Sequence, residues 1–307
     1  MIKSLKIVAI LITGAFLLSS CDSDIPVAQL KAKYLKSNSA FVDIDGVSVH
    51  YIIEGRMDDS LPIVFIHGTS ASLHTWDTLS GLLKTNKKII RLDLPAFGLT
   101  GPNRLNQYDF NFYNQFLDEF LLKLNVTQCI VAGNSLGGSI AWNYAIASPD
   151  KVKQLILLDA SGYPKKDEKG SLGFKLAGIP VLNQALKHIS PISLIRKSLE
   201  DAFYNKSLVT EKMVEQYHDM LLREGNRAAV LELFQHPMKP DATKIKTITQ
   251  PTLIIWGKED QLISFNNAAL FKQDIRDSRV LVFDKVGHIP MEEAPNQVAK
   301  AILEFIK

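Results

Sequence analysis

The chain has 307 residues, of which 46% are hydrophobic and 22% are charged, and its formal net charge is +3. These values are those of an ordinary globular protein that is long enough to bury a sizeable core. The sequence contains no internal repeat, low-complexity tract or basic cluster. We therefore expect neither a repeat protein nor a surface that binds nucleic acid.

The first twenty residues have the layout of a secretory signal. A short basic start, MIKSLK, precedes the apolar stretch IVAILITGAFLL, which is too short to span a bilayer as a mature helix. Residues 18–21 read LSSC and resemble the lipobox of bacterial lipoproteins, in which small residues precede a cysteine. The resemblance implies that residues 1–20 are removed and that Cys21 is lipidated. An ordinary cleaved signal with an incidental cysteine is the alternative.

The expected location follows from the same stretch. A lipidated Cys21 would hold the protein at a membrane of the bacterial cell envelope, on the periplasmic face. Asp22 resembles the signal that keeps lipoproteins in the inner membrane of enteric-type bacteria. Residues 21–40 are predicted to be a tether with some helical content, since a lipid anchor needs a spacer. Cys129, inside an apolar run, is interpreted as a core thiol without a metal or disulfide role.

Apolar patterns predict an α/β fold. In residues 41–55, apolar and polar side chains alternate in two runs, one on each side of Asp45-Gly46. This pattern is a hairpin signal. Short, nearly continuous apolar runs then recur, as in strands that are covered on both faces. Helical stretches separate most of these runs, so we expect a mainly parallel sheet flanked by helices. The runs are PIVFIHG, KIIRLDL, CIVAGN, QLILLDA, TLIIWGKED and RVLVFDKV.

One long interval interrupts this alternation. About ninety residues between Ala160 and Thr252 contain no strand-like run, and a structureless loop of that length is implausible in a compact domain. We expect helices there instead and interpret residues 161–245 as an inserted helical cap on a core formed by residues 41–160 and 246–307. The predicted cap helices cover residues 172–188, 191–204, 210–223 and 227–235.

Ser135 is the candidate nucleophile. It lies in GNSLGG, directly after the apolar run CIVA and directly before the helical pattern SIAWNYAIA. This is the G-x-S-x-G pattern in the strand–turn–helix context that a nucleophile elbow requires. Small neighbours relieve the crowding of such a turn, and the amide of Leu136 at the start of the helix would be directed toward the reacting centre.

A serine nucleophile needs a base and a carboxylate that orients the base. Asp260 follows the strand-like run TLIIWG, and His288 follows RVLVF. Because the carboxyl ends of parallel strands meet at one edge of a sheet, these side chains are expected near Ser135. The chain order Ser, Asp, His is that of the triad in this type of fold. Glu259 and Asp284 are the rival carboxylates.

Five ordered stretches identify the chain as similar to the capped α/β-hydrolases. They cover the chain from about residue 41 to its end, and they are specific for the fold but much less so for the substrate. They are VFIHGTSAS, RLDLPAFGLT, GNSLGG, WGKEDQLIS and GHIPMEEAPNQV.

The resemblance also assigns residues around the triad. It implies that the backbone amides of Thr69 and Leu136 form the oxyanion hole, where one donor is worth on the order of 10²–10³ in rate. His67 would order the oxyanion loop and line the site without acting as the base. Asp93 would support the end of the sheet. Trp142 is expected in the core rather than in the acyl pocket.

The expected activity is cleavage of carboxylic esters with small to medium acyl groups, through an acyl-enzyme and without metal or organic cofactor. Hydrolysis of C–C bonds in ring-cleavage dienols, of lactones or thioesters, and perhydrolysis are alternatives on the same residues. An aspartate nucleophile, which epoxide hydrolases and haloalkane dehalogenases use, is disfavoured by Ser135. A lipid-anchored binding protein on a retired hydrolase fold is also disfavoured, because all three triad positions are filled.

Overall fold

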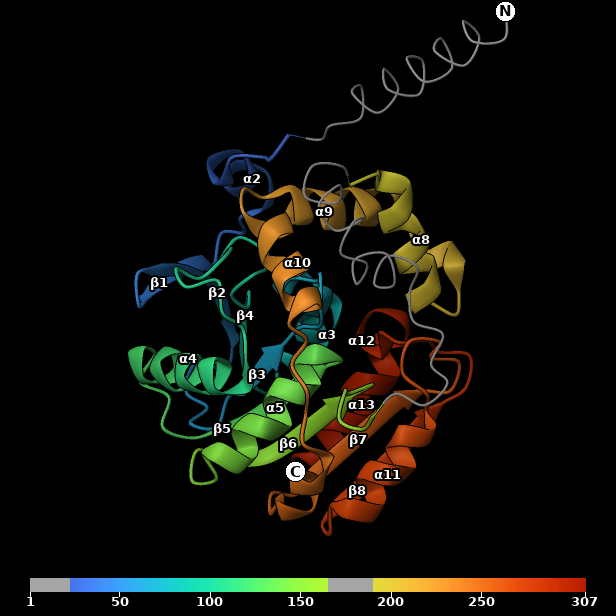
Figure 1. The fold of residues 1–307 in the computed structure, drawn as a ribbon. Coiled ribbons are helices and arrows are strands. Elements are labelled where there is room, and N and C mark those ends of the chain that lie inside the picture. The colour runs from blue at the N-terminus through green and yellow to red at the C-terminus, as the bar shows by residue number, and fades with distance from the viewer. Residues whose placement is uncertain (1–22, 165–189) are drawn as a thin grey trace, which may run out of the picture.

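The computed structural model describes residues 23–164 and 190–307, and an eight-stranded sheet organises them (Figure 1). The strand order is β1-β2-β4-β3-β5-β6-β7-β8. β1 pairs antiparallel with β2, and β2 with β4, whereas all the other neighbours are parallel. The strands are β1 (Ser39–Ile44), β2 (Val47–Gly55), β3 (Ile63–Ile66), β4 (Lys88–Leu92), β5 (Cys129–Asn134), β6 (Val152–Leu158), β7 (Thr252–Gly257) and β8 (Ser278–Phe283).

The predicted hairpin and the six predicted strands are confirmed. Asp45 and Gly46 both have positive φ, 49° and 73°, as a two-residue turn of the I′ type requires. Each central strand presents alternate side chains to the two faces of the sheet, and both faces are covered by helices. The predicted α/β architecture, a mainly parallel sheet flanked by helices, is therefore confirmed.

Two apolar cores lie on opposite faces of the sheet. Val64 and Ile66 of β3 pack into one core, and Ile63 and Phe65 into the other. The first core is completed by α4 (Phe110–Lys123), α5 (Leu136–Ala147) and α11 (Asn266–Asp274). The second is completed by α3 (Asp77–Leu83) and α13 (Pro295–Phe305). Cys129 is buried in the first core, and burial raises the pKa of its thiol to about 12, in keeping with a structural role.

Helices of the predicted cap lie together at one end of the sheet (Figure 1). Three of the four expected helices are confirmed, and the expected helix at 172–188 lies outside the described residues. The core resumes slightly before residue 246, because Ile245 is already buried in the first apolar core. The helical elements are α8 (Ile192–Ala202), η2 (Lys206–Leu208), α9 (Glu211–Leu222), α10 (Asn226–Gln235) and η3 (Ala242–Thr247).

The stretch predicted to be a tether with some helical content contacts the cap from residue 23 onward. The amide of Ile25 donates to Leu222 O at 2.7 Å, which joins this segment to the end of α9. The following helix, α2 (Val27–Tyr34), buries Leu30 against Met220, and Lys33 forms ion pairs with acidic residues of α9. Its apolar face is covered by the cap, so the segment is part of the folded domain. Its helical content was expected.

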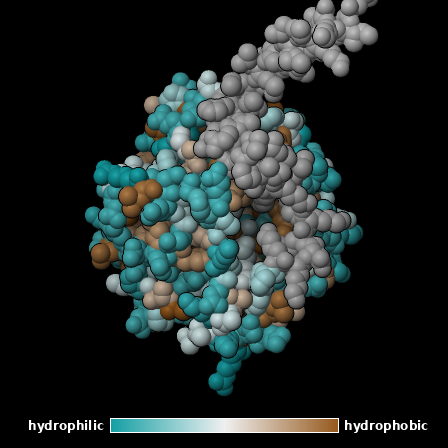
Figure 2. Space-filling model, viewed as in Figure 1, coloured by the Kyte–Doolittle hydropathy of each residue, from teal (hydrophilic) through white to brown (hydrophobic). Residues whose placement is uncertain are grey.

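The signal, Cys21 and Asp22 lie outside the described residues. Within residues 23–164 and 190–307, no helix combines the length and the apolar character needed to cross a bilayer. On the face shown in Figure 2, the described surface is mainly hydrophilic and its hydrophobic residues occur in small, separate groups, as is usual for a globular domain.

Candidate active site

The turn at Ser135 connects β5 to α5 with an unusual backbone. Ser135 has φ 55° and ψ −116°, a conformation that costs a non-glycine residue on the order of 1–3 kcal/mol and is typical of functional sites. A Cβ at Gly133 would lie 2.2 Å from Gly137 O, and a Cβ at Gly137 would lie 2.2 Å from Ile66 O. The glycines thus let α5 approach β5 and β3 closely, as the elbow motif predicted.

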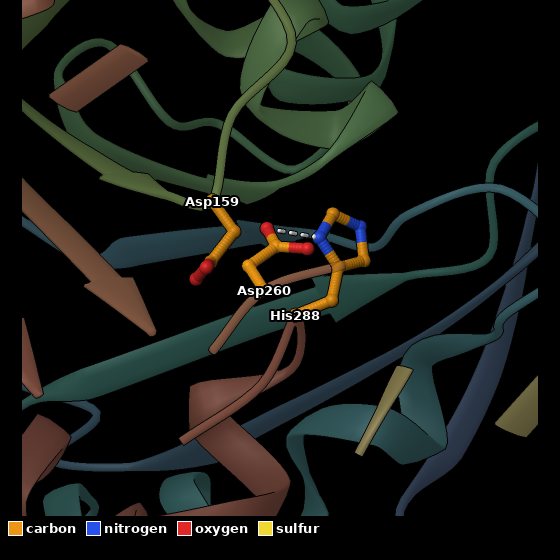
Figure 3. A group of neighbouring side chains, drawn as sticks. All are labelled: Asp159, Asp260 and His288. Atoms are coloured by element: carbon orange, nitrogen blue, oxygen red, sulfur yellow. Dashed lines mark hydrogen bonds and ion pairs between the residues drawn. The ribbon is translucent and has the colours of Figure 1, made fainter. Parts of the chain in front are cut away.

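His288 and Asp260 meet at the carboxyl ends of β7 and β8. His288 Nδ1 lies 2.7 Å from Asp260 Oδ2, and both residues are buried (Figure 3). The other carboxylate oxygen, Oδ1, accepts the amides of Leu262 at 2.8 Å and Ile263 at 3.0 Å. These donors hold Asp260 in one orientation, and Asp260 in turn orients the imidazole and fixes the proton on Nδ1.

The two rival carboxylates have other partners. Glu259 accepts the amide of Val286 at 3.0 Å, and Asp284 pairs with Lys258 at 2.6 Å on the surface. Among the described carboxylates that the sequence offered, Asp260 is therefore the one that contacts His288.

Asn134 ties the serine turn to the histidine loop, a role that the sequence analysis missed. Its Nδ2 donates to His288 O at 3.0 Å and to Leu158 O at 3.1 Å. His288 N donates to Ala202 O of the cap at 2.7 Å. A polar residue at the end of a buried strand, directly before the candidate nucleophile, was the available signal. Asn134 thus fixes the loop that carries the base relative to the elbow.

Ser135 and His288 line the same cavity, of about 160 Å³, between the core and the cap. An apolar cavity of about 150 Å³ holds a molecule of the size of benzene, so this one accommodates a short chain or a single ring. Gly68 and Thr69 border it beside Ser135, and the cap supplies most of its apolar wall. The apolar wall residues of the cap are Leu194, Ile195, Leu199, Ala202, Leu221, Val230, Leu231 and Phe234.

His67 orders the loop that carries Thr69. His67 is fully buried, its Nδ1 lies 2.8 Å from Gly68 O, and its Nε2 lies 3.0 Å from the donating amide of Leu94. Because Nε2 accepts, the ring is neutral with its proton on Nδ1, and burial lowers its pKa. The ordering role predicted for His67 is confirmed, whereas the cavity wall includes its neighbours Gly68 and Thr69 rather than His67 itself.

The two residues expected to form the oxyanion hole lie on either side of the elbow. Leu136 is the first residue of α5, and the first amides of a helix have no intrahelical acceptor and lie at its positive end. Thr69 lies on the cavity wall beside Ser135. The expected oxyanion residues thus lie at the start of α5 and on the adjoining loop.

Asp93 and Trp142 have the structural roles that were expected. Asp93 accepts the amides of Leu73 at 2.7 Å and Leu99 at 2.8 Å and pairs with His50. Burial alone would raise the pKa of Asp93, but His50 and these amides lower it to about 2. Trp142 is fully buried in the first core, and its Nε1 donates to Ser161 O at 2.9 Å.

A second carboxyl, Asp159, lies beside Asp260 and was not predicted. It follows β6, is fully buried, and accepts the amide of Gly257 on Oδ1 at 2.9 Å. Burial and the charge of Asp260 raise its pKa well above the usual range. Donor atoms of Asp159, Asp260 and His288 lie within 4.8 Å of one another, a spacing that could suit a metal ion. However, both oxygens of Asp260 and Nδ1 of His288 already bond to one another or to amides, which fits an acid–base arrangement better.

Comparison with known proteins agrees with this architecture. The model of the family described as alpha/beta hydrolase fold matches residues 62–295, and the chain belongs to this family. Its fold is that of the α/β-hydrolase enzymes.

Individual relatives are distant but extend over most of the chain. The chain is 28% identical over 270 residues to the uncharacterized hydrolase YugF of Bacillus subtilis, covering 86% of this chain and 96% of the relative. It is 24% identical to the human monoacylglycerol lipase ABHD6, covering 96% of this chain and 95% of the relative. A solved meta-cleavage product hydrolase from Pseudomonas fluorescens superposes with a TM-score of 0.75 at 22% identity, covering 87% of this chain and 97% of that one.

Proposed function

We propose that the protein hydrolyses carboxylic esters with small to medium acyl groups. The observation that carries the proposal is the cavity of about 160 Å³ that Ser135 and His288 share, with Asp260 bonded to the far side of the imidazole. The similarity to a monoacylglycerol lipase, which spans nearly the whole chain, supports an ester substrate. The apolar cap wall would bind the acyl group by removing its surface from water.

The proposed reaction has two halves. Ser135 Oγ attacks the ester carbonyl while His288 Nε2 takes its proton, and the imidazolium is stabilised by Asp260. The amides of Thr69 and Leu136 bind the oxyanion, and His288 returns the proton to the departing alcohol. Water, activated by His288, then cleaves the acyl-enzyme and releases the acid. None of these steps calls for a metal or an organic cofactor.

The main alternative reaction on the same triad is hydrolysis of a C–C bond in dienols, and the cavity residues disfavour it. A dienoate substrate carries a carboxylate, and Arg227 lies on the cavity wall. However, Asp24 Oδ1 accepts from Arg227 Nε at 3.1 Å and Nη2 at 2.5 Å, so this cation is already paired. The pairing favours a substrate whose acyl part is uncharged.

Two experiments test the proposed activity. A fluorophosphonate probe should label the wild type and not Ser135→Ala, and either Ser135→Ala or His288→Ala should reduce ester turnover by about 10⁴-fold or more. A panel of p-nitrophenyl esters of graded chain length, with a ring-cleavage dienol and a lactone, identifies the substrate class. A folded wild type that neither reacts with the probe nor turns over an ester would point to a binding protein instead.

We also propose that Cys21 carries a lipid that holds the protein at a membrane of the bacterial cell envelope, the inner one if Asp22 acts as a retention signal. Only two residues separate Cys21 from Asp24, whose carboxylate accepts from Arg227 of the cap. An anchor at Cys21 would therefore bring the cap close to the membrane surface. Metabolic labelling with palmitate should mark the wild type and not Cys21→Ser, and persistent labelling of the variant would contradict the anchor.

A further inference from the structure

We propose that Asp159 and Asp260 share one negative charge, and that Asp159 is a reserve carboxyl that supplies the charge facing His288 when Asp260 is absent. The inference rests on the proposed function, because it concerns the stabilisation of the His288 imidazolium. Asp159 acts through its neighbours and is a positioning residue rather than a catalytic one.

The geometry places two buried carboxyls around one imidazole. Asp159 comes from the end of β6, whereas Asp260 follows β7 and His288 follows β8 (Figure 3). One oxygen of each carboxyl and one ring nitrogen of His288 lie within 4.8 Å of one another. Two carboxylates this close in a buried site do not both ionise readily, because each charge raises the free energy of the other.

The hydrogen bonds indicate which carboxyl keeps the proton. Asp260 accepts two backbone amides and the imidazole, three donors that all favour its ionised form. Asp159 accepts one amide on Oδ1, and its buried Oδ2 has no hydrogen-bond partner among the described residues. A bare carboxylate oxygen in such a place is costly, whereas an O–H group is much less so. Asp159 is therefore the protonated member, with its proton on Oδ2.

A third carboxylate near the pair acts in the same direction. Glu293, from α12 (Pro290–Glu293), adds negative charge near Asp159 and favours its protonated form. When Asp260 is replaced by a neutral residue, the largest charge opposing ionisation of Asp159 disappears. Asp159 then releases its proton to solvent, and its carboxylate, within 4.8 Å of the ring, stabilises the imidazolium in place of Asp260.

The test uses Asp159→Asn, Asp260→Asn and the double variant, with ester turnover and its pH profile as readouts. Asp159 has φ 44°, a left-handed conformation that asparagine adopts more readily than most residues, so the backbone tolerates the Asp159→Asn change. Asp284→Asn is the matched control, because Asp284 is also next to the histidine loop but pairs with Lys258 on the surface. Thermal unfolding of each variant establishes that it is folded.

The reserve role predicts a non-additive result. The kcat/KM of Asp159→Asn should stay within about threefold of the wild-type value. The kcat/KM of Asp260→Asn should fall by about 10²-fold. That of the double variant should fall by about 10⁴-fold, which is the loss typical of a triad without its carboxylate. The acid limb of the pH profile of kcat/KM should lie at a lower pH in the double variant than in Asp260→Asn, by one pH unit or more.

Each alternative outcome is distinct. An active wild type whose Asp260→Asn variant already loses about 10⁴-fold, with no further loss in the double variant, overturns the reserve role alone. If Asp260→Asn does not fold, Asp260→Ala takes its place in the same comparison. An acid limb unmoved by Asp159→Asn supports a protonated Asp159, whereas a downward shift of one pH unit or more would mean that Asp159 carries the charge. A wild type that turns over no ester overturns both this inference and the proposed function.

Discussion

Glu292 connects the cap to the core, and its carboxyl should make the stability of the protein depend on pH. Tyr217 of α9 donates its hydroxyl to Glu292 Oε1 at 2.8 Å, and Thr75, from the short helix η1 (Leu73–Trp76), donates to the same oxygen. Burial, opposed in part by these two donors, raises the pKa of Glu292 from 4.5 to about 7. Asp77 adds a smaller effect in the same direction as burial.

The sign of the effect follows from proton binding in the two states. Between about pH 4.5 and pH 7 the folded protein keeps the proton of Glu292, whereas the unfolded chain loses it. Stability must therefore fall as the pH rises through this window. At 1.36 kcal/mol for each pH unit, the full effect is about 3 kcal/mol. Glu292→Gln is neutral at every pH and should lack this part of the decline.

The assay is the free energy of unfolding of wild type and Glu292→Gln, measured by denaturant titration at pH 5 and pH 8. The decline from pH 5 to pH 8 should be smaller in the variant by about 2.5 kcal/mol. Asp159 contributes a decline of the same sign, but it is present in both proteins and cancels in the comparison. Glu304→Gln, which removes a partly exposed charge paired with Arg279, is the control and should leave the decline unchanged. Parallel pH profiles for wild type and Glu292→Gln would refute the reasoning.

Three further predictions concern the elbow and its surroundings. Gly137→Ala should destabilise the protein by more than about 3 kcal/mol, because the new Cβ would lie 2.2 Å from Ile66 O. Denaturant unfolding measures this loss, and a change of less than about 1 kcal/mol would contradict the close packing of α5 on β3. Gly81→Ala should instead stabilise the protein by about 1 kcal/mol, because Gly81 lies in α3 and a Cβ there would meet no atom within 4 Å. A loss of stability in the same unfolding assay would show that the helix does not tolerate the change. Asn134→Ala should cost about 1–3 kcal/mol by removing the donor to the buried carbonyl of His288, and it should lower kcat more than it changes KM because His288 loses its tie to the elbow. Unchanged kcat would show that the loop is held without it.

Much of the fold could be predicted because its signals are local. The run CIVAGN reads as a buried strand, and a glycine-rich turn before an apolar helical pattern predicts the elbow at Ser135. Asp45-Gly46 specifies the hairpin turn through the positive φ that both residues adopt. Each of these features depends on neighbours within a few residues along the chain.

The docking of residues 23–40 on the cap could not be predicted, for a complementary reason. The segment contains three lysines and three serines interspersed with its apolar residues, and it shows no long apolar run, so its sequence is interpreted as a spacer. Its docking depends on partners about 190 residues away: Leu30 packs on Met220, and Lys33 pairs with Glu215 and Asp219. No pattern within the segment indicates that this complementary surface exists.

The sequence by itself determined the strand–helix alternation, the elbow at Ser135 and the candidates Asp260 and His288, because periodicity and turn chemistry are written in consecutive residues. Only the tertiary structure decided that Asp260 rather than Glu259 or Asp284 reaches the imidazole, and that Asp159 stands beside it. The physical reason is that a parallel sheet brings the ends of β6, β7 and β8 to one edge, and hydrogen-bond geometry and burial, rather than spacing along the chain, then select the partners.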